Sequence, residues 1–250
     1  MSLIDRSVLK DGCIIPGWPA PDNVRSLQTT RNGGVSVAPY ASLNLGSHVG
    51  DAELTVARNR MLLEPLLPSE PVWLKQVHGT VVVNAGQAGC LPEADACVSS
   101  HPGAVCVVMT ADCLPVLLCD DQGSVVGAAH AGWRGLCDGV LEQTVQEMEV
   151  PPTKLMAWFG PAIGAQAFEV GEDVRGEFVA RQPLAAAAFV PGIQGKWLAD
   201  IYLLARLRLN ALGITRIYGG GLCTYTDSAN FFSYRRDGAT GRMGTFIWLE

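Results

Sequence analysis

Short hydrophobic segments separated by polar or glycine-containing stretches recur along the chain. They are typical of β-strands, because each is too short for an ordinary helix and is bounded by Gly, Pro, Asp or Asn. The segments that we interpret as strands are 72–77, 80–84, 104–110, 115–119, 124–130, 155–159, 214–219 and 245–249. The pattern predicts a protein rich in β-sheet.

Three longer segments carry apolar residues at helical spacing. ELTVARNRMLLEPLL follows Asp51, which can cap a helix, and GVLEQTVQEM is the second such segment. ADIYLLARLRLNALG is predicted to begin near Asp200 and to end at Gly213, a suitable residue after a last turn. Strands and helices alternate with no obvious linker. We therefore expect an α/β (α+β) fold, a single domain over residues 1–250 in which mixed β-sheets are flanked by helices.

The composition narrows the cellular setting. Of 250 residues 48% are hydrophobic and 17% are charged, which is enough to bury a core. No segment approaches the roughly 20 apolar residues of a membrane span, and Asp5 and Asp11 lie where a secretory signal would be basic and then apolar. A formal charge of -6 with scattered Arg residues argues against nucleic acid as a partner. We expect a cytoplasmic protein that uses neither membrane nor nucleic acid.

Eight Cys residues are present, with no CxxC pair and no short disulfide framework. In a cytosolic chain they should be mostly reduced. Cys106 and Cys119 lie within apolar strand-like segments and are typical core residues. Most of the thiols are therefore expected to be structural, and a functional role for any of them needs a separate argument.

Such an argument exists for Cys113, because polar residues gather where predicted strands end. KQVHGT places His78 at one strand end, TADC places Cys113 between two strands, and AAHAGWRG places His130 at a third. Two imidazoles and a thiolate suit zinc, and three ligands leave a fourth position for water, as in catalytic sites. Their wide spacing alone is a weak signal, since a lone His is more often structural.

Two readings compete with a catalytic metal. Cys113 and His130 could form a nucleophilic thiolate and imidazole pair oriented by His78, or the zinc could be structural in a binding module. Copper oxidation of phenols is disfavoured because the blue-copper and trinuclear sites need many imidazoles, and the chain has four His. Two of these, His48 and His101, lie in polar loops and are not expected to take part.

The motifs together resemble those of a known family. In order they are TTRNGGVSVAPYASLNLGSHVGD, LKQVHGT, ADACVSS, TADCLPVLLCD, AAHAGWRGL, GPAIGAQAFEVG, CTY and FFSYRRDGATGR. From about residue 28 onward the chain resembles the laccase-domain family, whose bacterial members are called YfiH-type polyphenol oxidases or peptidoglycan editing factors. The resemblance implies a single domain of mixed sheets and a zinc site formed by His78, Cys113 and His130, with copper as a candidate substitute.

The same resemblance implies two activities. One is phosphorolysis of adenosine, inosine, guanosine and methylthioadenosine, with deamination of adenosine, so that the partners are a small-molecule nucleoside and phosphate. The other is removal of a wrongly incorporated L-serine from a muramyl nucleotide precursor, UDP-MurNAc-L-Ser. A zinc site that activates water or polarises a leaving group suits both, and the sequence does not choose between them.

Phosphorolysis needs an anion site, for which arginine is the natural residue. Arg60 matches the family's NR motif, and we expect Leu54, Met61 and Leu62 on its helix to face the core and leave its guanidinium free for phosphate. Arg31 in TTRNGG and Asn44 in SLNLG are expected to bind substrate. The alternatives are that Arg60 pairs with an acid on its helix and that Asn44 caps a turn.

Asp112, next to Cys113, is the candidate for moving protons or for orienting a ligand histidine. Asp95 in EADAC is expected to hold a loop. Trp133 is expected to pack rather than to stack on a base, although a purine would suit its flat face. Arg235 and Arg236 in SYRRDG are interpreted mainly as residues that hold a loop in place.

Overall fold

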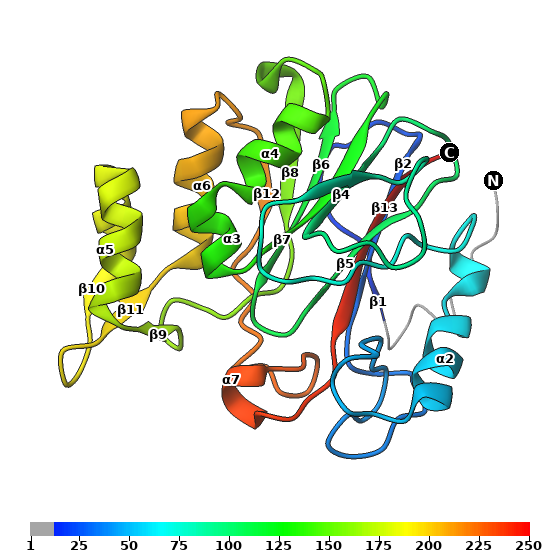
Figure 1. Ribbon diagram of the computed structural model, residues 1–250, viewed down its shortest axis with the longest axis horizontal. Helices are drawn as coiled ribbons and strands as arrows, with labels where there is room; N and C mark the ends of the chain where they lie inside the picture. Colours follow the sequence, from blue (N-terminus) through cyan, green and yellow to red (C-terminus); the bar gives the residue numbers. More distant parts are fainter. Residues whose placement is uncertain (1–12) are drawn as a thin grey trace.

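The computed structural model describes residues 13–250, and a six-stranded mixed sheet lies at its centre (Figure 1). The strand order is β12-β8-β6-β7-β4-β3, with parallel pairing of β12 to β8 and of β3 to β4 and antiparallel pairing elsewhere. The strands are β3 (Val82–Asn84), β4 (Ala96–Ser99), β6 (Leu114–Asp120), β7 (Val126–Ala131), β8 (Leu155–Phe159) and β12 (Ile217–Gly219).

A four-stranded antiparallel sheet packs against one face of the first. Its order is β1-β2-β13-β5, so the last strand lies between an early strand and a central one. The strands are β1 (Cys13–Ile14), β2 (Val24–Thr29), β5 (Cys106–Thr110) and β13 (Met243–Leu249). Side chains of β5 and β13 share one core cluster with side chains of β6, β7 and β8. Residues distant in sequence therefore meet between these sheets.

Helices cover the outer faces (Figure 1). The other face of the six-stranded sheet packs against α3 (Trp133–Asp138), α4 (Val140–Glu147) and α6 (Ile201–Ala211), and α5 (Glu172–Arg181) lies farther from the sheet, against α3. The outer face of the four-stranded sheet packs against Leu63 and Leu66, at the 3-10 helix η1 (Glu64–Leu66), which follows α2 (Glu53–Met61) in the chain. The remaining elements are α7 (Tyr234–Asp237), η2 (Pro152–Lys154), η3 (Pro183–Ala188) and a small sheet of β9 (Glu169–Val170), β10 (Phe189–Pro191) and β11 (Trp197–Ala199).

Strand β6 shows why the central strands are continuously hydrophobic. Val116 and Leu118 belong to the core on the helix side, whereas Leu117 and Cys119 belong to the core between the sheets. Because successive side chains point to opposite faces, a strand covered on both sides needs apolar residues throughout. The mixed α/β fold with flanking helices is thus confirmed. None of the described helices is long and apolar enough to cross a bilayer.

The structure corrects two predictions at the N-terminal side of the site. Segment 72–77 is not a strand and forms only isolated bridges, of Val72 with Cys106 and of Lys75 with Glu93. Helix α2 has Ala52 at its N-cap with no side-chain bond, so Asp51 does not cap it through a side chain. The carboxylate of Asp51 instead accepts hydrogen bonds from Ser36 Oγ and Asn44 Nδ2. The predicted helix start at Asp200 is confirmed, since its side chain accepts from Leu203 N.

Asp5 and Asp11, which argued against a secretory signal, lie outside the described residues. The cytoplasmic location stays a prediction.

Candidate metal centre

Three ligand-type side chains meet at the edge of the two sheets. The candidate ligand atoms of His78, Cys113 and His130 all lie within 4.8 Å of one another, and this group could hold a metal ion. Cys113 Sγ lies 3.7 Å from His78 Nε2, and the imidazole rings of His78 and His130 meet edge to face with centroids 4.8 Å apart. The three residues that the sequence singled out are therefore brought together.

Different elements bring each residue to this place. His130 lies near the end of β7 and is buried, whereas Cys113 lies in the turn through which the chain leaves β5 of one sheet for β6 of the other. His78 lies in a loop and has a φ of 62°, a left-handed conformation that costs energy outside glycine. A non-glycine residue held in such a conformation must be fixed by its surroundings.

Asp95 supplies that fixation. Its carboxylate accepts hydrogen bonds from the backbone N–H groups of Val77, His78 and Gly79 at 3.2, 2.9 and 2.7 Å. It is also 2.8 Å from Nδ1 of His130. Burial would raise the pKa of Asp95, but the bonds to His130 and to the loop lower it. Asp95 therefore holds a loop, as expected, and also orients His130 with Nε2 as its free ligand atom, an arrangement common around metal-bound histidines.

The electrostatics of the group favour a thiolate. Burial would raise the pKa of Cys113, but His130 and then His78 lower it to about 6. Burial would lower the pKa of His130, but Cys113 and Asp95 raise it to about 9. In the metal-free protein at neutral pH, Cys113 is therefore an anion beside a cationic imidazole. The thiolate is the form of cysteine that binds metals and that acts as a nucleophile.

The spacing fits a tetrahedral ion. A Zn–N bond of about 2.0 Å and a Zn–S bond of about 2.3 Å at the tetrahedral angle separate the two ligand atoms by roughly 3.5 Å, close to the 3.7 Å found between Cys113 Sγ and His78 Nε2. The space is kept open by Gly132, because a Cβ there would lie 2.7 Å from His78 Cδ2 and 3.0 Å from Cys113 Sγ. The donor set and the opening both fit a small cation.

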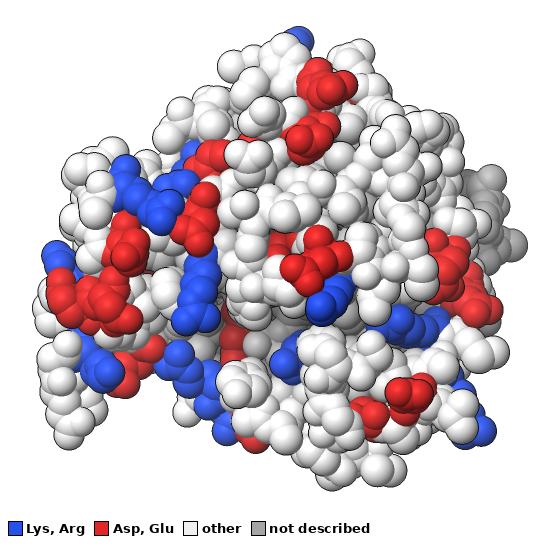
Figure 2. All heavy atoms as spheres, in the orientation of Figure 1, with Lys and Arg blue, Asp and Glu red and all other residues white. Residues whose placement is uncertain are grey.

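The group opens into a cavity of about 430 Å³, a size typical of small-ligand sites. Apolar and aromatic side chains form part of its wall, together with Asp112 and two cations. The residues that line it are His48, Gln76, His78, Met109, Thr110, Ala111, Asp112, Cys113, His130, Trp133, Ile163, Phe168, Ile201, Tyr234, Arg235 and Arg242. In Figure 2, blue side chains border a hollow below the centre of this face, and elsewhere basic and acidic side chains are interspersed.

Asp112 lies in the cavity wall, but its carboxylate is engaged by the protein. Oδ1 accepts from Thr224 Oγ1 at 2.6 Å, and Oδ2 accepts from the backbone N–H of Arg235 at 2.7 Å. Its φ of 97° belongs to the turn that also carries Cys113. Asp112 thus ties the cysteine turn to the C-terminal segment.

The structure does not place Arg60 in this cavity. Its guanidinium donates to Leu45 O at 3.1 and 2.8 Å and lies 3.8 Å over the ring of Trp73, beside a separate pocket of about 360 Å³. The prediction that Leu54, Met61 and Leu62 face the core is wrong, because all three side chains are exposed. Helix α2 therefore does not direct Arg60 towards the metal ligands.

Arg31 and Asn44 are likewise held by the chain itself. Arg31 donates to Ala41 O and Ser228 O and lies 4.8 Å over the ring of Phe232. Asn44 is fully buried; its Oδ1 accepts from Gly46 N and from Arg242 N. Both residues fasten segments around the cavity and do not line it.

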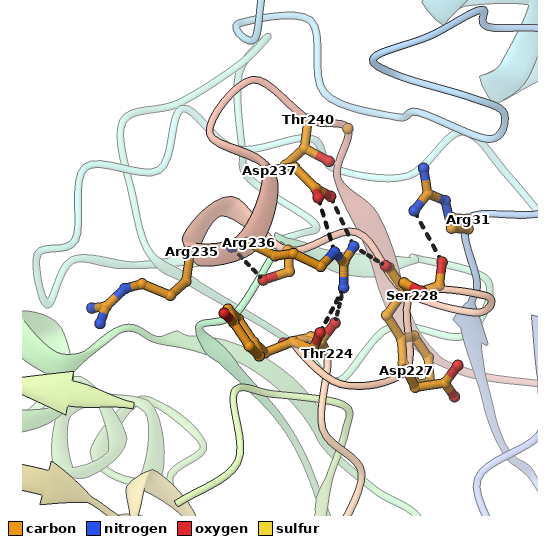
Figure 3. Close-up of polar contacts among 12 residues, drawn as sticks. Arg31, Thr224, Asp227, Ser228, Arg235, Arg236, Asp237 and Thr240 are labelled. Atoms are coloured by element: carbon orange, nitrogen blue, oxygen red, sulfur yellow. Dashed lines mark hydrogen bonds and ion pairs between the residues drawn. The ribbon is translucent and has the colours of Figure 1, made fainter. Parts of the chain in front are cut away.

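The two neighbouring arginines, Arg235 and Arg236, make different contacts (Figure 3). Arg236 donates to the carbonyls of Thr224, Tyr225 and Phe231 and pairs with Asp237, so it fastens a loop as expected. Figure 3 shows Arg235 directed away from this network. Its Nη1 donates to Glu169 O at 2.8 Å, and the residue lines the cavity.

Sequence reasoning missed His48 and Arg242, both of which line the cavity. His48 was expected to be uninvolved, yet burial and then the charge of Arg242 lower the pKa of its imidazole. Arg242 is the last residue of the FFSYRRDGATGR motif, but its contact with Asn44, 198 residues away in sequence, could not be predicted from that motif.

The chain matches proteins of known family over nearly its whole length. Residues 25–250 match the family model described as multi-copper polyphenol oxidoreductase laccase. The protein named purine nucleoside phosphorylase YfiH of Escherichia coli K12 is 55% identical over 239 residues, which cover 94% of this chain and 98% of that protein. A purine nucleoside phosphorylase of Pseudomonas aeruginosa is 54% identical over 238 residues, which cover 95% and 98%.

Solved structures agree. A crystal structure of a Neisseria meningitidis protein matches with a TM-score of 0.93 and 54% identity, covering 96% of this chain and 99% of that one. YlmD from Geobacillus stearothermophilus matches with a TM-score of 0.85 and 31% identity, covering 96% and 97%. The motif resemblance is therefore confirmed, and the chain belongs to the multi-copper polyphenol oxidoreductase laccase family.

Proposed function

We propose that this protein is a zinc-dependent purine nucleoside phosphorylase, which cleaves the bond between purine and ribose with phosphate. The observation that carries the proposal is the group of His78, Cys113 and His130 opening into a cavity of nucleoside size. The names of the relatives, purine nucleoside phosphorylases, support the reaction class. The proposed substrates are adenosine, inosine, guanosine and methylthioadenosine, with deamination of adenosine as a second activity.

The polar and the apolar walls of the cavity would have different roles. His78, Cys113 and His130 would hold zinc, which supplies Lewis acidity and an acidic bound water when present. Asp95 would keep His130 in the ligating orientation. Both oxygens of Asp112 accept hydrogen bonds from the protein, which favours an orienting role for this carboxylate over direct proton transfer.

The apolar wall would take the flat purine. Phe168 and Trp133 are aromatic residues of the lining, and Ile163 and Ile201 add aliphatic surface. Such faces bind an aromatic base through burial of its rings. Trp133 would therefore have a ligand contact in addition to its packing role.

The test is to incubate the zinc-loaded protein with inosine, with and without phosphate, and to separate the products. We expect hypoxanthine and ribose 1-phosphate to form only when phosphate is present. Ala variants of His78, Cys113 and His130 should lose zinc and activity together while keeping their fold. Zinc retained in full by all three variants, or base release without phosphate, would contradict the proposal.

Two other functions are favoured by particular observations. The cations in the cavity wall, Arg235 and Arg242, also suit the diphosphate of a muramyl nucleotide, so UDP-MurNAc-L-Ser is the parallel substrate to test for release of L-serine. The anionic Cys113 beside His130 would also suit a metal-free hydrolase. Activity that survives complete removal of metal would favour that hydrolase.

Copper is proposed only as a substitute in the same site. The family description names copper, but the chain has four His, and within residues 13–250 one group of His, Cys and acidic residues could hold a metal. A multicopper oxidase needs several imidazole-rich sites. Zinc-loaded, copper-free protein should therefore show negligible phenol oxidation, and robust turnover in that preparation would refute this argument.

A further inference from the structure

The arginines near the cavity differ in how far the protein itself occupies their N–H groups. Arg31 uses Nε, Nη1 and Nη2 for carbonyls of the chain. Arg236 does the same with carbonyls and Asp237 (Figure 3). The guanidinium of Arg60 is placed on Leu45 O and Trp73, away from the metal ligands. None of these three lines the cavity, so none is placed to bind an anion beside the metal.

Arg242 is arranged differently. Its Nη1 donates to Thr240 O and Gly241 O, both at 3.0 Å, which anchors one end of the guanidinium. The N–H groups on Nε and Nη2 have no acceptor within residues 13–250, and no carboxylate there forms an ion pair with them. These two nitrogens form one edge of the planar group, the fork that matches two oxygens of a phosphate.

The position of Arg242 is built into the fold. Its backbone N–H donates to Asn44 Oδ1 at 2.9 Å, and its carbonyl accepts from Leu45 N at 3.1 Å. A Cβ on Gly46 would lie 2.8 Å from Arg242 Cγ, so the stem of the arginine lies directly against this glycine. The SLNLG segment, residues 42–46, therefore fixes the position of Arg242. Asn44, which is buried and does not line the cavity, is thus connected to it through Arg242.

The charges around Arg242 favour an added anion. Two anions act on Arg242: the Cys113 thiolate, whose charge bound zinc would offset, and Asp112, both of whose oxygens already accept hydrogen bonds. Arg235, whose Nη1 donates to Glu169 O, adds a second positive charge to the same wall, but it is more exposed than Arg242. Arg242 is half-buried, so its charge is screened less than that of an exposed side chain.

We infer that Arg242 is the phosphate-binding residue of this cavity, with its Nε and Nη2 edge facing the anion. Asn44 and Gly46 are the positioning residues that hold it there. The identity of the anion rests on the proposed phosphorolysis, but binding of phosphate can be measured without any turnover. The inference replaces Arg60 as the residue expected to bind phosphate.

The experiment titrates inorganic phosphate into the full-length, zinc-loaded protein by calorimetry at constant ionic strength, with and without hypoxanthine. Loss of a charge-assisted bidentate contact should weaken binding about tenfold to a hundredfold in Arg242→Gln. Arg242→Lys keeps the positive charge but loses the paired N–H donors of the guanidinium. Its phosphate affinity should therefore lie between those of the wild type and of Arg242→Gln. Arg58→Gln removes an exposed positive charge on α2 and should bind phosphate as the wild type does.

A third variant tests whether Gly46 positions Arg242. Gly46→Ala should push the arginine stem aside and weaken phosphate binding, while zinc content and thermal stability stay close to wild type. The expected kinetic signature is a raised KM for phosphate with little change in the KM for inosine. Equal changes in both KM values would show that Gly46 shapes the whole cavity, and the positioning role would be overturned.

The outcomes separate this inference from the proposed function. Wild-type protein that fails to bind phosphate in either titration, or folded Arg242 variants with wild-type affinity, would overturn the inference. Phosphate binding through Arg242 without any base release would uphold the subsite and refute phosphorolysis. Phosphorolysis with an unchanged phosphate KM in Arg242→Gln would uphold the activity and refute the subsite.

Discussion

Asp95 joins two metal-ligand candidates at the scale of single residues. One carboxylate fixes both the left-handed backbone of His78 and the ring of His130. The sequence shows Asp95 only as an acid in a small motif, because its partners lie up to 35 residues away. His78, Cys113 and His130 could be found from their places at strand ends, whereas the contact that aligns two of them could not.

Replacement of Asp95 by Asn tests this link. The variant keeps the size of the side chain but removes its charge, so His130 loses an ionic partner and the loop loses part of its anchor. Zinc affinity should fall about tenfold to a hundredfold, the usual range for such supporting residues. Competition with a chromophoric chelator measures it. Glu93→Gln, an exposed acid in the same segment, is the control, and equal affinities in both variants would contradict the role of Asp95.

Arg60 is expected to act on stability. Its contacts with Leu45 O and the Trp73 ring predict that Arg60→Ala loses about 1–3 kcal/mol of unfolding free energy. Urea denaturation measures this, with the exposed Arg58→Ala as a control expected to change little. Unchanged stability together with a phosphate KM raised tenfold or more would restore the role that the NR motif indicated.

Elements were predictable where one local rule governs them. Strand β8 coincides with the expected segment 155–159, because a strand buried on both faces is hydrophobic throughout. Segment 72–77 looks similar, with Trp73 and Leu74 buried, yet the backbone there makes only single bridges. Burial of side chains in a loop gives the same sequence pattern as a strand, so periodicity alone could not distinguish them.

The junction of β7 and α3 carries a prediction of its own. Gly132 has an ordinary φ of -65°, so its backbone tolerates alanine, but the added Cβ would lie 2.7 Å from His78 Cδ2. Gly132→Ala should therefore displace His78 and lower zinc content without unfolding the protein. Gly176→Ala in α5, where a Cβ meets nothing within 4 Å, is the matched control. Full zinc occupancy in Gly132→Ala by elemental analysis would contradict the geometry.

At the scale of the whole molecule, the cavity depends on chain segments from opposite ends. β13 pairs with β2 and β5, and this pairing brings Arg242 beside Asn44 and close to the turn that carries Cys113. Local periodicity predicts strands but not which strands pair, so the fold class was accessible from the sequence and the anion subsite was not. The metal candidates lie at the border of this layered core and not within it.

That layout predicts how the protein responds to metal removal. The core clusters on both faces of the six-stranded sheet contain none of the three candidate ligands, so the fold should persist when zinc is chelated. Thermal stability should fall only by the free energy of zinc binding to the folded state. Circular dichroism before and after chelation measures this. Global unfolding on chelation would indicate a structural zinc instead.

The most direct measurement of the central claim adds zinc stepwise to metal-stripped protein and follows ribose 1-phosphate formation from inosine and phosphate. We predict that activity rises in proportion to bound zinc and reaches a plateau at about one ion per chain, the stoichiometry of a single three-ligand site. The Cys113→Ala variant should show neither binding nor activity. Full phosphorolysis activity before any zinc is added, or no activity when zinc fully occupies the site, would contradict the account.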